Sequence, residues 1–272
     1  MTSTKPKNPQ FSVHAHFYQP AREDPFSGEI HQEAGAAPYH NWNERIYYEC
    51  YKPNADVGNF ARCSFNVGPT LAEWMRRRYP ETWADIARQE ALFRQRFGAS
   101  NALAQAYFHP IMPLLNLRDK LTQVRWGIAA YQHQFGHAPL GFWLPETAVD
   151  IESLEVLAEL GIQYTILAPW QAKRPDLDTS HPYRVELPSG RSLAIFFYHA
   201  KLSTALSFNP PSSENADSFA LKELLPSYED YDLDDALILV ASDGELYGHH
   251  QPFRDMFLAR LLDKSLETAS IT

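Results

Sequence analysis

Short apolar runs alternate with amphipathic helical stretches along most of this 272-residue chain. Strand-length runs separated by helices are typical of parallel βα units, because parallel neighbours need a long crossover connection. The runs predict seven strands, at residues 11–16, 63–67, 102–108, 140–144, 162–167, 192–198 and 236–241. A regular α/β barrel has eight strands. We therefore predict an α/β fold, an irregular (β/α)7 barrel with parallel strands and outer helices.

Helices are predicted between these strands, at residues 70–78, 80–97, 118–135, 150–160 and 252–267. Pro80 suits a first helical turn, Gly98 suits a helix stop, and Asp150 suits an N-cap. Residues 17–60 form a long irregular segment, and a segment of that length inside a compact domain is functional or contains short helices. Residues 210–217 are predicted to form a polar loop.

The charge and composition exclude several classes of protein. The net charge of −9 argues against a nucleic-acid partner, since no basic excess exists to neutralise phosphates, and it suits a neutral substrate such as a sugar. No apolar stretch approaches the length of a membrane helix, so no membrane partner is expected. Residues 1–10 are polar and lack a secretory signal, so we expect a disordered leader and a cytoplasmic location. Cys50 and Cys63 have no zinc-ligand spacing and are expected to be reduced thiols.

Two carboxylate motifs follow predicted strands that lie far apart in the sequence. Glu146 comes just after the run at 140–144, and Asp243 and Glu245 come just after the run at 236–241. The carboxyl ends of such strands are where α/β folds place their chemistry. Glycosidic bond cleavage needs two carboxyl groups of this kind. The alternative interpretation makes Glu146 a helix-entry carboxylate and Asp243 part of an ordinary turn.

Polar and aromatic side chains near the strand ends form a second set of candidates. His14 and His16 lie at i and i+2 of the first strand, so both point to one face. They are either a metal pair or two hydrogen-bond donors for sugar hydroxyls. The further candidates for binding a sugar are Gln19, Asn66, His109, Trp143, Glu245, His249 and His250.

Five motifs taken together resemble glycoside hydrolase family 57. They are spread over residues 13–250 in the order found in that family. They are His14-Ala15-His16-Phe17-Tyr18-Gln19-Pro20, Phe65-Asn66-Val67-Gly68-Pro69-Thr70, Tyr107-Phe108-His109-Pro110-Ile111-Met112-Pro113-Leu114, Trp143-Leu144-Pro145-Glu146-Thr147-Ala148 and Asp243-Gly244-Glu245-Leu246-Tyr247-Gly248-His249-His250.

The resemblance implies a (β/α)7 barrel that acts on α-glucans or oligosaccharides with retention and needs no cofactor or metal. It implies that Glu146 is the nucleophile and that Asp243 is the general acid/base. The residues that it places along the sugar subsites are His14, His16, His109 and Trp143. Members of the family usually continue into a C-terminal helical region, so residues 11–272 are expected to be the barrel catalytic domain without that region.

Two other functions remain open at this point. The first is a metal-dependent hydrolase of the polysaccharide deacetylase type, in which His14, His16 and Asp243 hold a divalent metal. The second is a non-catalytic or truncated protein that binds a sugar without turning it over. Loss of activity with a chelator favours the first, and glucan binding without turnover favours the second.

Overall fold

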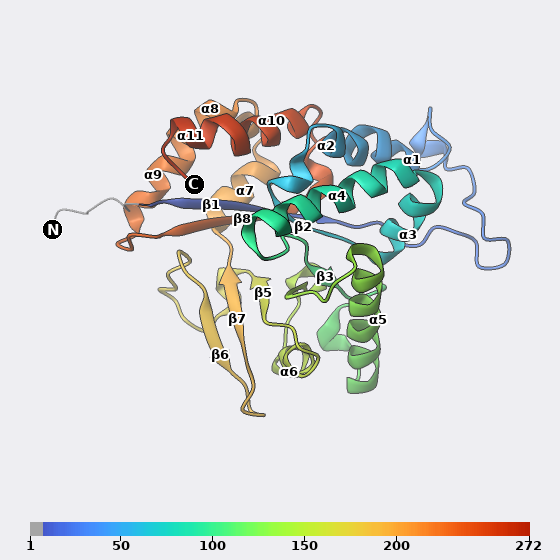
Figure 1. Cartoon of the computed structure of the whole chain (residues 1–272), viewed down its shortest axis with the longest axis horizontal. Coiled ribbons are helices and arrows are strands. Elements are labelled where there is room, and N and C mark those ends of the chain that lie inside the picture. The colour runs from blue at the N-terminus through green and yellow to red at the C-terminus, as the bar shows by residue number, and fades with distance from the viewer. Residues whose placement is uncertain (1–7) are drawn as a thin grey trace.

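Eight strands in two sheets form the centre of the fold in this computed structural model, which describes residues 8–272 (Figure 1). One sheet has the order β2-β1-β8 and the other has the order β3-β4-β5-β7-β6. All neighbouring pairs are parallel except the β6–β7 hairpin. The strands are β1 (Gln10–Phe17), β2 (Ser64–Val67), β3 (Ala104–Gln105), β4 (Gly141–Trp143), β5 (Tyr164–Leu167), β6 (Tyr183–Glu186), β7 (Ser192–Phe197) and β8 (Leu237–Asp243).

Helices cover the outer faces of both sheets. Figure 1 shows α2, α8, α10 and α11 on one side of the long strands β1 and β8, with the five-stranded sheet on the other side. Single π-helical segments join α1 to α2, α8 to α9 and α10 to α11. The helices are α1 (Trp42–Ile46), α2 (Lys52–Asp56), α3 (Pro69–Arg78), α4 (Pro80–Phe97), α5 (Leu117–Phe135), α6 (Ile151–Glu159), α7 (Ala200–Phe208), α8 (Ala216–Phe219), α9 (Leu225–Ser227), α10 (Arg254–Arg260) and α11 (Leu266–Thr268).

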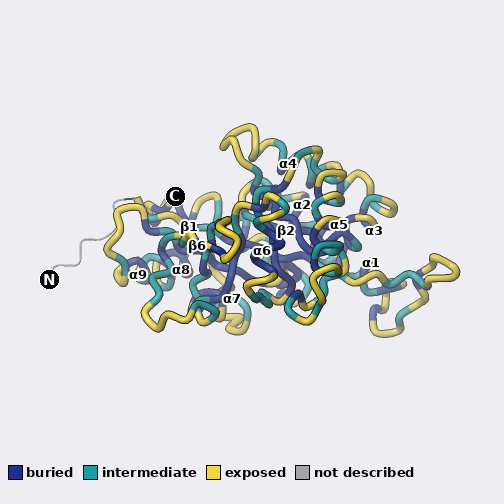
Figure 2. Tube along the Cα trace, turned by 90° about the horizontal axis from the view of Figure 1, so that it is seen from below, coloured by how far each residue is buried: buried dark blue, intermediate teal, exposed yellow. Residues whose placement is uncertain are grey.

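Strand β1 separates two apolar clusters because its alternate side chains point to opposite faces. Val13 and Ala15 belong to the main core beneath the helices, whereas His14 and His16 point to the other face. A smaller inner cluster contains Trp143, Leu239 and neighbouring apolar residues from both sheets. Figure 2 shows this buried centre surrounded by exposed loops and helix faces. The two buried histidines therefore lie between the sheets, where a barrel has its interior.

The two sheets are connected differently at their two sides. On one side the backbone N–H of Phe65 donates to Asn101 (3.0 Å), and that of Leu103 donates to Phe65 (2.8 Å). On the other side no strand ladder joins β7 to β8 within residues 8–272. There, the backbone N–H of His199 donates to the carbonyl of Leu239 (2.7 Å), just past the end of β7. The α/β composition and the parallel strands confirm that part of the prediction, but the sheets do not close into a barrel.

Most predicted elements are confirmed. All seven predicted strands are present, and each is parallel to its neighbours among those seven. Pro80 begins α4, and Gly98 ends it in the left-handed conformation that favours glycine (φ +76°). Asp150 caps α6, since its side chain accepts a hydrogen bond from the backbone N–H of Ser153 (2.8 Å). The irregular segment at 17–60 does contain short helices, α1 and α2.

Several predicted boundaries are wrong. The third strand covers only Ala104–Gln105, because the residues after it turn away into the loop that carries His109. The expected polar loop at 210–217 contains a 3₁₀ turn, Pro210–Ser213, and the start of α8. Strand β6 and helix α7 were not predicted. Helix α7 has no Ser, Thr, Asp or Asn at its start, and the ring of His199 caps it instead.

The leader was predicted to extend to residue 10, which is too far along the chain. Residues 8–10 are part of the fold, because the backbone N–H groups of Asn8 and Gln10 donate to Asp234 and Ala236 (2.8 and 2.9 Å). Gln10 is the first residue of β1. Residues 1–7 lie outside the described part of the chain, so the prediction for them is not tested. Both cysteines are buried and unpaired. Within residues 8–272, no helix combines the length and the apolarity needed to cross a bilayer.

Candidate active site

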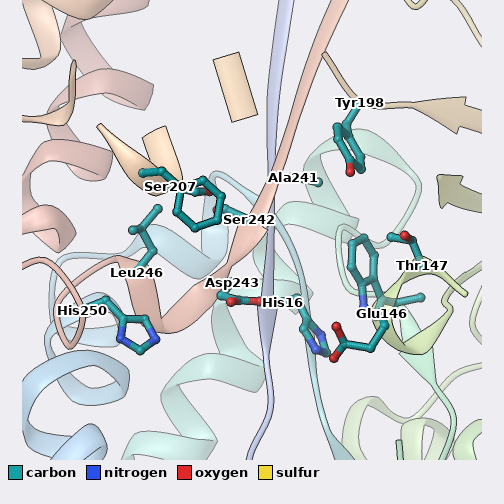
Figure 3. A pocket seen from close by; sticks show the side chains of 12 residues that line it. His16, Glu146, Thr147, Tyr198, Ser207, Ala241, Ser242, Asp243, Leu246 and His250 are labelled. Atoms are coloured by element: carbon teal, nitrogen blue, oxygen red, sulfur yellow. The ribbon is translucent and has the colours of Figure 1, made fainter. Parts of the chain in front are cut away.

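A cavity of about 540 Å³ opens at the carboxyl ends of the strands (Figure 3). Both sheets contribute to it, since β1 and β8 end on one side and β4 and β7 end on the other. Figure 3 shows the side chains of Asp243, His16 and Glu146 pointing into the same space. The lining residues are His16, Trp143, Glu146, Thr147, Tyr198, Ser207, Phe208, Ala241, Ser242, Asp243, Leu246 and His250. Each sheet thus supplies one of the two carboxylates predicted from the sequence.

Strand register explains why residues from distant motifs meet here. In the parallel ladders His16 is paired with Asn66 on β2 and with Asp243 on β8. In the second sheet Gln105 on β3 is paired with Trp143 on β4. Because parallel strands end at the same edge, these five residues lie near one another, with His16, Trp143 and Asp243 lining the cavity and Asn66 and Gln105 buried behind them.

The amide of Asn66 holds two buried histidines in place. Its Oδ1 lies 3.0 Å from Nε2 of His14, and its Nδ2 lies 2.9 Å from Nδ1 of His16 and donates to Oε1 of Gln105 (2.5 Å). The hydroxyl of Ser64 lies 2.9 Å from Nδ1 of His14. Burial lowers the pKa of His14 to about 4. Burial, reinforced by the charge of the neighbouring His109, lowers the pKa of His16 to about 3. Both rings are therefore neutral near pH 7 and available as hydrogen-bonding groups.

His109 lies beside this network in a conformation that is rare for its residue type. Its φ is +55°, in the left-handed region. Its Nε2 lies 3.0 Å from Nε2 of His16, and its ring stacks on Tyr18 with centroids 4.0 Å apart. Burial lowers the pKa of His109, and the negative charge of Glu146 opposes that change. The ring and the Glu146 carboxylate are therefore close enough to interact through charge.

Glu146 projects into the cavity from a strained turn. It lies in the 3₁₀ turn Pro145–Thr147, and both Glu146 and Thr147 have positive φ (+55° and +52°). Consecutive non-glycine residues in this region are unfavourable unless neighbouring groups hold them there. The side chain of Gln171 supplies one such contact, because its Nε2 donates to the carbonyl of Thr147 (2.5 Å). Its Oε1 accepts from the backbone N–H of Ala168 (2.8 Å), which fixes the amide.

The Asp243 carboxyl lies opposite Glu146 and has a raised pKa. Loss of hydration is the main cause, and the negative charge of Glu146 adds to it, while His250 acts in the opposite direction. A carboxyl with a raised pKa is suited to donating a proton near neutral pH. The cavity therefore contains two carboxyl groups, one of which has a raised pKa.

Three sequence candidates are held away from the cavity by other partners. Oε1 of Gln19 accepts a hydrogen bond from Arg22 (2.9 Å). Nδ1 of His249 lies 2.5 Å from the carboxylate of Glu49. Glu245 is 6% exposed and points into the core. The other candidates either line the cavity, as His16, Trp143 and His250 do, or support the residues that line it, as His14, Asn66 and His109 do.

Glu245 is expected from the sequence to bind substrate, but its side chain is buried and does not line the cavity. Its Oε1 accepts hydrogen bonds from the hydroxyl of Tyr51 (2.7 Å) and from the backbone N–H of Tyr18 (3.1 Å). It therefore ties the loop after β1 to the segment after β8, which is a structural role. Burial raises the pKa of Glu245 to about 7, despite the two hydrogen bonds that favour the ionised form.

Other residues of the site were missed. Tyr198 lines the cavity just past β7, and the position of that strand end in the sequence could have indicated it. Gln105 lies inside a predicted strand and carried no signal of its own. Phe208 reaches the cavity from the unpredicted helix α7. Within residues 8–272, Nε2 of Gln105 and Nε1 of Trp143 are buried donors without a hydrogen-bond partner.

The donor set does not favour a metal. Within the described residues, no group of three or more His, Cys, Asp and Glu side chains is placed to hold a metal ion. His14 and His16 share the Asn66 amide, and Nε2 of His16 faces His109. Among residues 8–272, His14, His16 and Asp243 are therefore not grouped as the deacetylase-type alternative requires.

The sequence profile of glycosyl hydrolase family 57 matches residues 16–272. The chain belongs to this family. It is 23% identical to an α-amylase of Pyrococcus horikoshii over 211 residues, covering 75% of this chain and 31% of that protein. It is 24% identical to a 4-α-glucanotransferase of Thermococcus litoralis over 214 residues, covering 75% and 30% of the two chains. The chain thus spans about a third of the length of these curated relatives.

Solved structures show the same fold. The 4-α-glucanotransferase of Thermococcus litoralis superimposes with a TM-score of 0.74 at 19% identity, covering 98% of this chain and 39% of that one. The branching enzyme of Pyrococcus horikoshii, described as of the GH57 type, gives a TM-score of 0.72 at 16% identity, covering 97% and 68%. The family 57 chain described here therefore has the architecture of enzymes larger than itself.

Proposed function

We propose that this family 57 chain forms the catalytic part of a retaining glycoside hydrolase or transglycosylase that acts on α-glucans. The observation that carries the proposal is the pairing of Glu146 and Asp243 in one cavity, with Asp243 held at a raised pKa. The relatives named above, an α-amylase, a 4-α-glucanotransferase and a branching enzyme, support the choice of α-glucans. We further propose that the seven parallel strands represent the irregular (β/α)7 barrel, opened between β7 and β8.

In the proposed reaction Glu146 attacks the anomeric carbon while the bond to the leaving oxygen breaks. Asp243 gives its proton to that oxygen, and a glycosyl-enzyme ester forms on Glu146. In the second half Asp243, now ionised, takes a proton from water or from an acceptor hydroxyl. That oxygen attacks the anomeric carbon and releases Glu146. The two inversions give net retention of configuration.

The neutral histidines fit a role in holding sugar hydroxyls. A neutral ring can donate from one nitrogen and accept at the other, and it brings no positive charge beside Glu146. His16 lines the cavity at its floor, and His109 lies beside both His16 and Glu146. We assign these two rings, with the indole of Trp143, to the sugar unit that is attacked.

The test is substitution of each carboxylate by its amide. Glu146→Gln should lower the release of reducing ends from maltoheptaose and soluble starch by about 10³-fold or more, because the nucleophile is lost. Asp243→Asn should lower it by roughly 10²–10⁴-fold. The control is Glu159→Gln, at an exposed carboxylate on α6, which should leave the rate unchanged.

The stereochemical outcome tests the mechanism separately. Proton NMR of the first product should show the α-anomer before mutarotation, as retention requires. A β-anomer would indicate inversion and would remove Glu146 from the role of nucleophile. Glucan binding without turnover by the natural chain would instead identify a sugar-binding protein.

A further inference from the structure

An exposed aromatic ring stands at the rim of the cavity and has no part in the mechanism above. Trp170 is 70% exposed, and it lies in the 3₁₀ turn Pro169–Gln171 that follows β5. A large indole left in water is costly, since its apolar face gains nothing from hydration. An indole beside a cleft offers an apolar face and an N–H group to a ligand.

One ring contact places Trp170 beside the wall of the cavity. Its ring meets the ring of Tyr198 edge to face, with centroids 5.8 Å apart and planes at 85°. Tyr198 itself lines the cavity. The residue after Trp170 is Gln171, whose amide holds the carbonyl of Thr147 in the turn that carries Glu146. The indole therefore lies beside Tyr198 in the cavity wall, and its own turn is bonded to the turn that carries Glu146.

The geometry of the pair suits a sugar chain better than a flat ligand. Because the two rings are nearly perpendicular, they form a corner between a largely exposed indole and a phenol that lines the cavity. Pyranose rings carry C–H groups on one face and hydroxyls at their edges, so they stack on indole faces while their edges stay hydrated. Successive units of an α-glucan turn relative to one another, which a corner can follow.

We propose that Trp170, supported by Tyr198, forms an additional subsite that binds a glucose unit of an α-glucan outside the catalytic cavity. This inference rests on the proposed function and narrows its substrate class. The chain prefers glucans long enough to reach from Glu146 to Trp170 over di- and trisaccharides.

The experiment compares substitutions of two tryptophans, Trp170 and Trp126, on a long and a short maltooligosaccharide. Trp170→Ala should lower kcat/KM for maltoheptaose about tenfold, chiefly through KM, and should change kcat/KM for maltotriose less than twofold. Trp170→Phe should retain most of the activity on maltoheptaose, because a ring remains. The matched control is Trp126→Ala, at an exposed indole on α5 that does not line the cavity. This variant should leave kcat/KM unchanged for both substrates.

The outcomes separate this inference from the proposed function. Equal losses on both substrates, or no loss on either, would overturn the subsite while leaving the glycosidase intact. If the natural chain turns over no glucan, the proposed function fails, and calorimetric titration with maltoheptaose then tests the subsite directly. Weaker binding by Trp170→Ala than by Trp126→Ala supports the subsite in that case, and equal binding rejects it. Thermal unfolding of each variant confirms that the chain is folded.

Discussion

At the scale of single residues, the proposed nucleophile Glu146 lies in a turn with a strained backbone. Glu146 and Thr147 both have positive φ, which costs of the order of 1–3 kcal/mol per residue. The turn persists because Pro145 fixes one side and the amide of Gln171 bonds the carbonyl of Thr147 on the other. Gln171 is therefore a positioning residue for a carboxylate that it does not itself contact.

Replacing Gln171 tests this positioning. Gln171→Ala should lower kcat about tenfold with KM within twofold, because the loop relaxes and Glu146 loses its alignment. Gln171→Glu keeps the size of the side chain but has no N–H to donate, so it should show the same fall. The control is Gln132→Ala, at an exposed residue on α5. A rise in KM alone would mean that Gln171 serves binding.

Glu245 makes the stability of the fold depend on pH. Its folded pKa of about 7 lies above the ordinary value of 4.5, so the folded state binds the proton more tightly. This contribution is fully present below about pH 4.5 and is lost as the pH rises through 7. From pH 5 to pH 8 the natural chain should lose roughly 2–3 kcal/mol of unfolding free energy relative to Glu245→Gln.

Urea unfolding at the two pH values measures this difference. The comparison with Glu245→Gln is needed because His14 and His16, whose pKa values are lowered, contribute with the opposite sign. Those contributions cancel between the two proteins. The same difference at pH 5 and pH 8 would show that Glu245 is ionised throughout.

The residues that line the cavity were easier to predict from the sequence than the residues that hold them in place. Glu146, Asp243 and His16 stand at strand ends, where residue type and position alone suggest function. Glu245 also follows a strand, but it turns inward after Gly244, and nothing in the spacing of the motif records that direction. Gln171 was missed because a side chain that bonds a backbone carbonyl in another loop leaves no local pattern.

At the scale of elements, helix α5 lies close to β3 because Gly127 has no side chain. A Cβ at this position would lie 1.9 Å from the carbonyl oxygen of Gln105. The side chain of Gln105 accepts a hydrogen bond from Asn66, and Asn66 holds both buried histidines. The packing of an outer helix is therefore linked through Gln105 and Asn66 to the buried histidines.

Gly127→Ala should destabilise the chain by about 2–3 kcal/mol, since α5 must move away from β3. An alanine in an unhindered helix would stabilise instead, by up to about 1 kcal/mol. Activity should fall with stability because Gln105 and Asn66 are displaced. Urea unfolding and the rate on maltoheptaose measure both effects, with the exposed Arg125→Ala on α5 as control. A neutral or stabilising result would contradict the close contact.

Regular elements with strong end signals were predictable, and those defined by tertiary contacts were not. Helices α4 and α6 begin and end at Pro, Asp and Gly signals that act locally. Strand β3 is only two residues long because its neighbours, not its own sequence, set the pairing. Helix α7 packs against β8, and Ser203 on it accepts a hydrogen bond from the N–H of Ala241 (3.2 Å). Its helical state depends on that packing.

At the scale of the whole molecule, the cavity lies between two sheets. Backbone bonds between strand-like segments join the sheets beside β2 and β3, but no strand pairing joins β7 to β8 within residues 8–272. A glucan bound there would touch His16 and Asp243 from one sheet and Trp143 and Tyr198 from the other. Binding should therefore stabilise the chain and should also tighten the open side between β7 and β8.

Maltoheptaose at about 100 times its Kd should raise the unfolding free energy of Glu146→Gln by about 2.7 kcal/mol. Hydrogen exchange of the amides of His199 and Ala241, which bridge the open side, should slow in the same titration. The amide of Gly98, at the distant end of α4, is the internal control. Stabilisation without slower exchange at the two bridging amides would place the glucan on one sheet alone.

The missing strand pairing between β7 and β8, within residues 8–272, bears on how related chains can come to differ in activity. The distance between the Glu146 and Asp243 carboxyl groups is set by no single loop, because each residue belongs to a different sheet. It depends on the side where the sheets are joined, at the backbone bonds between Phe65 and the chain before β3, which we call the pivot. Substitutions near the pivot could then adjust the choice between water and sugar acceptors while every residue in the cleft stays the same.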